Sequence, residues 1–129
     1  YAYREMELTD WRPFIKAAIE RNPVYHSDLS GRHADEIYEI INALSNESIY
    51  DSGRLAQPDE VWNFRRGDGA EKVFLMADAL MHNDTGAEVK ISLGGGNAVI
   101  EYNSRSYRFS TSKGHKKNIH ISRHGYIAG

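Results

Sequence analysis

The sequence contains no cysteine. Disulfide bonds, thiolate metal sites and every mechanism with a cysteine nucleophile are therefore excluded for this chain. A strong charge of one sign is also missing, because 16 basic residues face 18 acidic ones and the formal net charge is −2. Such a balance gives no electrostatic drive toward nucleic acid or an anionic membrane surface, so we do not expect either as a partner.

Long apolar runs are missing as well. No run approaches the roughly 20 residues that span a bilayer, and no signal peptide is visible, so the sequence indicates no compartment. The 129 residues are 40% hydrophobic and 26% charged, which is typical of a soluble globular domain. We therefore treat 1–129 as a single domain, with the expectation that a chain starting at Tyr1 is processed or part of a longer protein.

Hydrophobic periodicity predicts helices in the first two thirds of the chain. Apolar residues recur at three- and four-residue spacing near 9–22 and 34–43, which predicts two amphipathic helices. Pro58 suits the first position of a short helical turn that ends near Phe64. The stretch 70–82 is apolar around most of its circumference, which predicts a buried central helix.

Beyond residue 86 the period changes to two, as expected for strands. The sequences AEVKISL, NAVIEY, SYRFST and NIHIS each predict a short strand. Helices followed by strands indicate an α+β domain, with the central helix packed on an antiparallel sheet of about four strands. Asp78 lies within the apolar helix, where a buried carboxylate needs a partner, for example an arginine.

Two motifs occur in a specific order. Gly67-Asp68-Gly69 stands directly before the buried helix, and Asn97-Ala98-Val99-Ile100-Glu101 opens a predicted hairpin that ends at Thr111. This order resembles the transglutaminase-like (papain-like thiol) superfamily. In that family a catalytic cysteine follows Gly-Asp, a histidine opens a His-Ala-Trp-Val-Glu strand, and an aspartate ends the next strand.

The resemblance extends upstream of these motifs and covers 49–112. Tyr50-Asp51, Pro58-Asp59-Glu60 and Arg65-Arg66 are similar to segments that precede Gly-Asp in many members of the family. Within the central helix, Ala77 is similar to an alanine about eight positions after the family's cysteine. The resemblance implies a transglutaminase-like core for this domain.

All three catalytic positions depart from the family pattern. Gly69 stands at the cysteine position, Asn97 at the histidine position, and Ser110 or Thr111 at the aspartate position. Thiol catalysis needs a nucleophile, a base and a group that orients the base, so the resemblance implies a catalytically inactive domain. Three simultaneous changes favour a natural loss over one engineered replacement.

The resulting hypothesis is a binding or scaffolding module without a cofactor or metal. Its old active-site cleft would hold a protein, peptide or glycan ligand, with bare helix N–H groups at Gly69 available to an anion. The binding residues expected in this cleft are Gly69, Asn97, Thr111, Asp68 and Trp62.

Two alternatives remain. The first is a hydrolase or transferase with relocated chemistry, in which Asn97 and the hydroxyls of 110–112 act with His115 or His120, although no GxSxG setting is present. The second is a purely structural interaction domain. Its old cleft would be filled by Trp62, Phe64 or Tyr107.

Three other patterns receive structural interpretations. The six histidines show no metal-ligand spacing, and His120 between two isoleucines should face solvent. The basic residues Lys113, Lys116, Lys117 and Arg123 are typical of a solvated turn and edge strand. Arg66-Gly67-Asp68 leads into a buried helix, which argues against an adhesion motif.

Overall fold

The computed structural model describes residues 29, 31–50, 55–84, 86–114 and 116–122, and the backbone of 125–128. The helix predicted near 9–22 lies outside these residues. In chain order the described elements are α3 (Ala34–Asn42), α4 (Pro58–Phe64), α5 (Gly69–Asn83), β1 (Val89–Gly94), β2 (Asn97–Tyr102), β3 (Arg105–Ser110), β4 (Lys117–Ser122) and β5 (Gly125–Ala128).

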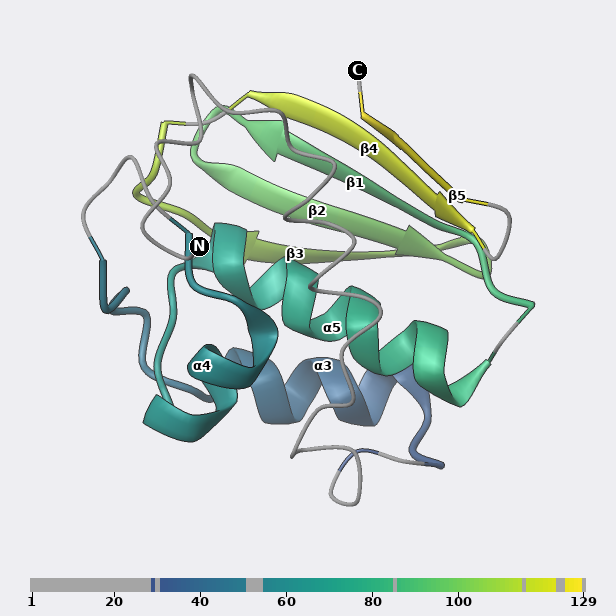
Figure 1. Cartoon of the computed structure of the whole chain (residues 1–129), viewed down its shortest axis with the longest axis horizontal. Helices are drawn as coiled ribbons and strands as arrows, with labels where there is room; N and C mark the ends of the chain where they lie inside the picture. The colour runs from purple at the N-terminus through teal and green to yellow at the C-terminus, as the bar shows by residue number, and fades with distance from the viewer. Residues whose placement is uncertain are drawn as a thin grey trace.

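The helices and the sheet form two layers, with α5 directly beneath the sheet (Figure 1). The sheet is antiparallel throughout, with the strand order β3-β2-β1-β4-β5. This arrangement confirms the predicted α+β class, with a central helix packed on an antiparallel sheet. A fifth strand, β5, joins the expected four by pairing with β4. Its four residues are too short to show a period of two.

The central helix α5 is the core of the domain. Every residue from Gly69 to Met81 is buried, because apolar side chains surround the helix and meet the sheet on one side and α3 and α4 on the other. The strands bury alternate residues, as a sheet covered on one face requires. Ile119 and Ile121 are buried while His120 is partly exposed, as predicted.

Asp78 is buried on α5, as predicted, with only 1% of its surface exposed. His82 is one helical turn later, and its Nδ1 lies 2.9 Å from the Asp78 Oδ1. Burial raises the pKa of Asp78 to about 9.

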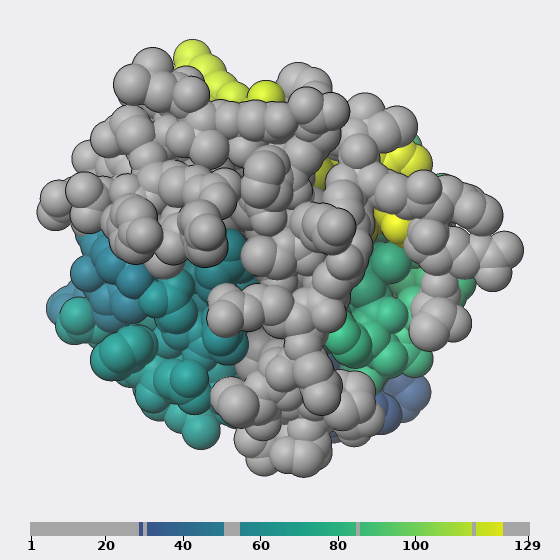
Figure 2. Space-filling model, in the orientation of Figure 1, coloured from purple at the N-terminus to yellow at the C-terminus, as the bar shows by residue number. Residues whose placement is uncertain are grey.

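The two ends of α5 differ in their access to solvent. In the space-filling view, the green region at the C-terminal end of α5 reaches the surface of this face, as does the teal region around α4 (Figure 2). His82 and Asn83 at that end are partly exposed, whereas Gly69 at the other end is buried. None of the helices in the described part of the chain is long and apolar enough to cross a membrane.

Candidate functional site

Three of the five predicted site residues, Asp68, Gly69 and Thr111, meet where α5 begins. Asp68 is the N-cap of α5 and Gly69 is its first residue. The Asn97 side chain, at the start of β2, lies on the sheet face opposite to the buried Ala98, and its Nδ2 donates to the Gly95 carbonyl at 3.3 Å. Its backbone pairs with Ser110, the last residue of β3. Thr111 follows directly, and its N–H donates to the Gly96 carbonyl at 3.0 Å. The helix start and the end of the β2–β3 pair are thus adjacent.

The fifth predicted residue, Trp62, lies on α4. Its ring is buried, and the Arg65 guanidinium carbon lies 4.1 Å from the ring centroid. The two other aromatic residues expected to fill the old cleft do not share one place either. Phe64 is 60% exposed, while Tyr107 is buried on β3 and donates its hydroxyl to Asp35 at 2.5 Å.

The helix begins at Gly69 because Asp68 and Glu71 form a capping box. The Ala70 N–H donates to Asp68 Oδ2 at 2.9 Å, and the Asp68 N–H donates to Glu71 Oε1 at 2.9 Å. The Asp68 carbonyl accepts the N–H groups of Glu71 at 2.9 Å and Lys72 at 2.8 Å. The N–H groups of Ala70, Glu71 and Lys72 therefore have acceptors within the protein, which argues against the bare helix N–H groups expected at this helix start.

The Asp68 carboxylate also binds the segment that follows β3. Its Oδ1 accepts the Ser112 N–H at 2.8 Å and the Ser112 hydroxyl at 3.0 Å. Its Oδ2 accepts the Thr111 hydroxyl. With 2% of its surface exposed, Asp68 joins the helix start to the strand exit from inside the protein.

Gly69 packs directly against the backbone of β3. A Cβ at this position would lie 2.1 Å from the Ser110 carbonyl oxygen and 2.7 Å from its carbonyl carbon, far inside van der Waals contact. Since the obstacle is backbone rather than a flexible side chain, a larger residue requires α5 or β3 to move. The position that resembles the family's cysteine is closed to any side chain.

Glu71 and Lys72 complete this polar cluster, although they are absent from the predicted site. Glu71 is fully buried, and its Oε2 accepts the Ser48 hydroxyl at 2.8 Å and the Ala56 N–H at 2.6 Å. The Asp-x-x-Glu spacing is a capping-box signal that could have identified Glu71.

Lys72 has no comparable signal. Its Nζ donates to the Leu44 carbonyl at 2.5 Å and to Asn46 Oδ1 at 2.6 Å. Burial lowers the pKa of the Lys72 ammonium, against a smaller opposite effect of Asp68. Together with Asp68 and Glu71, Lys72 forms a cluster that we call the cap network.

The side chains considered for relocated chemistry also make contacts within the protein. The described contacts of the Thr111 and Ser112 hydroxyls go to Asp68 and to the Lys113 N–H. His120 lies on β4, where its Nε2 is 3.5 Å from Glu88 Oε1, and His115 lies outside the described residues. Lys113, expected to be solvated, is instead only 5% exposed.

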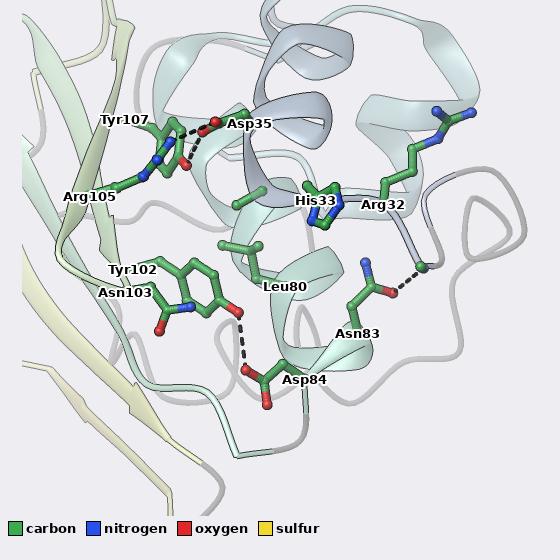
Figure 3. A pocket seen from close by; sticks show the side chains of 12 residues that line it. Arg32, His33, Asp35, Leu80, Asn83, Asp84, Tyr102, Asn103, Arg105 and Tyr107 are labelled. Atoms are coloured by element: carbon green, nitrogen blue, oxygen red, sulfur yellow. Dashed lines mark hydrogen bonds and ion pairs between the residues drawn. The ribbon is translucent and has the colours of Figure 1, made fainter.

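A pocket of about 390 Å³ lies at the other end of α5 (Figure 3). It is bordered by the start of α3, the end of α5 and the turn between β2 and β3. Over the described stretches, no three His, Asp or Glu residues are grouped to hold a metal ion. Comparisons with protein-family models, curated proteins and solved structures give no match for this chain.

Proposed function

We propose that this chain is a catalytically inactive transglutaminase-like domain that acts as a binding or scaffolding module. The family part of the proposal is supported by position. The start of α5 contacts the segment after β3 through Asp68 and Thr111, and Asn97 opens the neighbouring strand β2.

The absence of catalysis is supported chiefly by the contact between Gly69 and β3. No nucleophilic side chain fits 2.1 Å from the Ser110 carbonyl oxygen. The Asn97 side chain is an amide, which neither accepts nor releases a proton near neutral pH. A mechanism with its nucleophile at position 69 and its base at position 97 therefore lacks both groups.

Relocated chemistry has one contact in its favour, the Thr111 hydroxyl on the Asp68 carboxylate. That carboxylate also accepts hydrogen bonds from two N–H groups and from the Ser112 hydroxyl. Its oxygens therefore hold the structure together and are not available to take a proton from Thr111. The inactive domain is accordingly the better-supported function.

The experiment is an activity assay on the whole chain. We would measure incorporation of dansylcadaverine into casein and hydrolysis of p-nitrophenyl acetate, for the wild type, Thr111→Ala and Asn97→Ala. The expected result is no turnover above buffer in any of them. Turnover that disappears in Thr111→Ala, while the variant is still folded at the assay temperature, would instead establish a relocated active site.

Binding is favoured over a purely structural role because the chain has an open pocket lined by polar side chains. Amide shift mapping with extended peptides tests whether the old cleft takes part. Shifts centred on Asn97 and Thr111 would locate the ligand there. A chain that responds to neither peptides nor sugars would be a structural domain.

A further inference from the structure

The pocket at the C-terminal end of α5 is separate from the cap network. Its volume of about 390 Å³ is within the range of small-molecule sites, about 300–1,000 Å³. Gly69 and Asn83 lie 14 residues apart on α5, which corresponds to about 20 Å at 1.5 Å per residue. A ligand in this pocket would leave the old catalytic position untouched.

The interior of the pocket combines apolar and aromatic side chains. Figure 3 shows the Tyr102 ring beside Leu80, with the hydroxyl directed toward Asp84. That hydroxyl donates to Asp84 Oδ2 at 3.1 Å, and the Gly86 N–H holds Asp84 Oδ1 at 3.1 Å. The ring is therefore oriented before any ligand arrives.

The opposite wall is oriented in the same way. Asp35, at the start of α3, accepts the Tyr107 hydroxyl at 2.5 Å and Arg105 Nη1 at 2.6 Å. These contacts join residues about 70 positions apart in the sequence and fix the β2–β3 turn against α3. Two tyrosine–aspartate pairs thus line one pocket.

The polar groups keep capacity for a ligand. A carboxylate offers about four lone-pair sites and a guanidinium five N–H donors, so Asp84 and Arg105 can bind beyond their present partners. The side chains of Asp35 and Arg105 are 60% and 66% exposed, which leaves them accessible. Asn103 adds an exposed amide at the turn.

The charge of the pocket is balanced. Arg32 and Arg105 carry positive charge, and Asp35 and Asp84 carry negative charge. An anion or a cation would meet like charge as well as opposite charge. A neutral ring with many hydroxyls instead finds donors, acceptors and an aromatic face together.

We propose that this pocket binds a neutral pyranose sugar. The C–H face of the sugar packs on Tyr102 and Leu80, and its hydroxyls donate to Asp84 and accept from Arg105 and Asn103. The inference builds on the binding part of the proposed function, but it does not depend on the family assignment.

The test is an amide shift titration of the whole chain, with isotope labelling. The probes are glucose, galactose, mannose, N-acetylglucosamine and cellobiose into the millimolar range, with glucuronate and acetate as charged probes. We expect saturable shifts at Leu80, Asn103 and Arg105 for at least one neutral sugar, and none at Asn97 or Thr111. Binding of the charged probes alone, or of no sugar, would overturn the proposal.

Substitutions of Tyr102 test whether the sugar binds in this pocket. Tyr102→Ala removes the aromatic face and should weaken binding at least about tenfold. Tyr102→Phe keeps the face and should weaken it less. Glu101→Gln is the matched control, because the neighbouring strand residue points to the opposite face of the sheet.

Melting temperatures of the variants separate lost binding from lost folding. Affinity that is unchanged in Tyr102→Ala would refute the pocket assignment. Absence of sugar binding in a folded wild type would also refute it, while the peptide titration would still decide the proposed function. Turnover in the activity assay would overturn the proposed function and leave the pocket assignment standing.

Discussion

The two ends of α5 use carboxylates for different purposes. At the N-terminal end, Asp68 and Glu71 accept backbone N–H groups from three separate segments and are buried. At the C-terminal end, Asp84 and Asp35 accept tyrosine hydroxyls and remain exposed. The first end holds the chain together, and the second orients side chains around a pocket.

The difference has an energetic consequence. A backbone N–H in the interior has no substitute acceptor when its carboxylate is removed, so the desolvation penalty is felt in full. An exposed tyrosine hydroxyl that loses its carboxylate finds water instead. Substitutions in the cap network should therefore change stability, and substitutions around the pocket should change binding.

The largest effect is expected for Glu71→Ala. This change removes the acceptor of the Asp68 and Ala56 N–H groups and of the Ser48 hydroxyl. At about 1–3 kcal/mol for each lost partner, the free energy of unfolding should fall by about 5 kcal/mol, measured by urea denaturation. The free energy of unfolding should fall less in Glu71→Gln, because this variant keeps one acceptor oxygen. A loss below about 1 kcal/mol in Glu71→Ala would contradict a structural role for the cap network.

The second effect concerns pH and Asp78, whose pKa burial raises to about 9 from 3.8. Between these values the native state holds a proton that the unfolded state has lost. The stabilising contribution is therefore complete below about pH 4 and disappears as the pH rises toward 9, by up to about 1.4 kcal/mol per unit.

Asp78→Asn keeps the side chain neutral at every pH and should remove this dependence. Between pH 5 and pH 8 the wild type should lose up to about 4 kcal/mol more than the variant. Urea denaturation at both pH values measures the difference. If the free energy of unfolding changes equally in the two proteins between pH 5 and pH 8, Asp78 does not hold the proton in the native state.

The third effect is that of a single methyl group. Gly69→Ala places a Cβ against the Ser110 carbonyl, which should destabilise the protein by about 3 kcal/mol, near the upper end for overpacking. Gly114→Ala is the control, because a Cβ there meets no atom within 4 Å. Thermal unfolding compares them. Equal melting temperatures would mean that α5 is not closed against β3.

Local patterns were enough to predict much of the fold. The apolar circumference of α5 and the alternation in β1 to β4 come from neighbours in sequence, so both were predicted. The approach of Gly69 to Ser110 was not, because it depends on how closely a helix and a strand pack. Lys72 was missed for a related reason, since a lysine within a helix is ordinarily assigned to solvent.

The pocket could not have been predicted from local patterns at all. Asp35 and Arg105 are 70 residues apart, and only the packing of α3 beside β3 brings them within 2.6 Å. Tyr38, which contacts the rings of Tyr107 and Phe109 at centroid distances of 5.2 and 5.1 Å, fixes that packing. Sites built from such distant segments leave no fixed spacing in the sequence.

The smallest effect is also the most direct comparison of the two ends. Thr111→Val and Tyr102→Phe each remove one hydroxyl that donates to an aspartate, without a large change of side-chain shape. Thr111→Val also removes the acceptor of the Lys113 N–H, and the remaining aspartate is buried. It should lower the free energy of unfolding by about 1.5 kcal/mol, and Tyr102→Phe by about 0.5 kcal/mol or less.

Urea denaturation of both variants under the same conditions measures this ratio. The physical reason for the difference is the solvent around Asp84, which replaces the lost hydroxyl, whereas the interior around Asp68 has no such replacement. A larger loss in Tyr102→Phe than in Thr111→Val would reverse the assignment of the two ends. The Tyr102–Asp84 pair would then contribute more to stability than the Thr111–Asp68 pair, and the start of α5 would become the better candidate for a binding site.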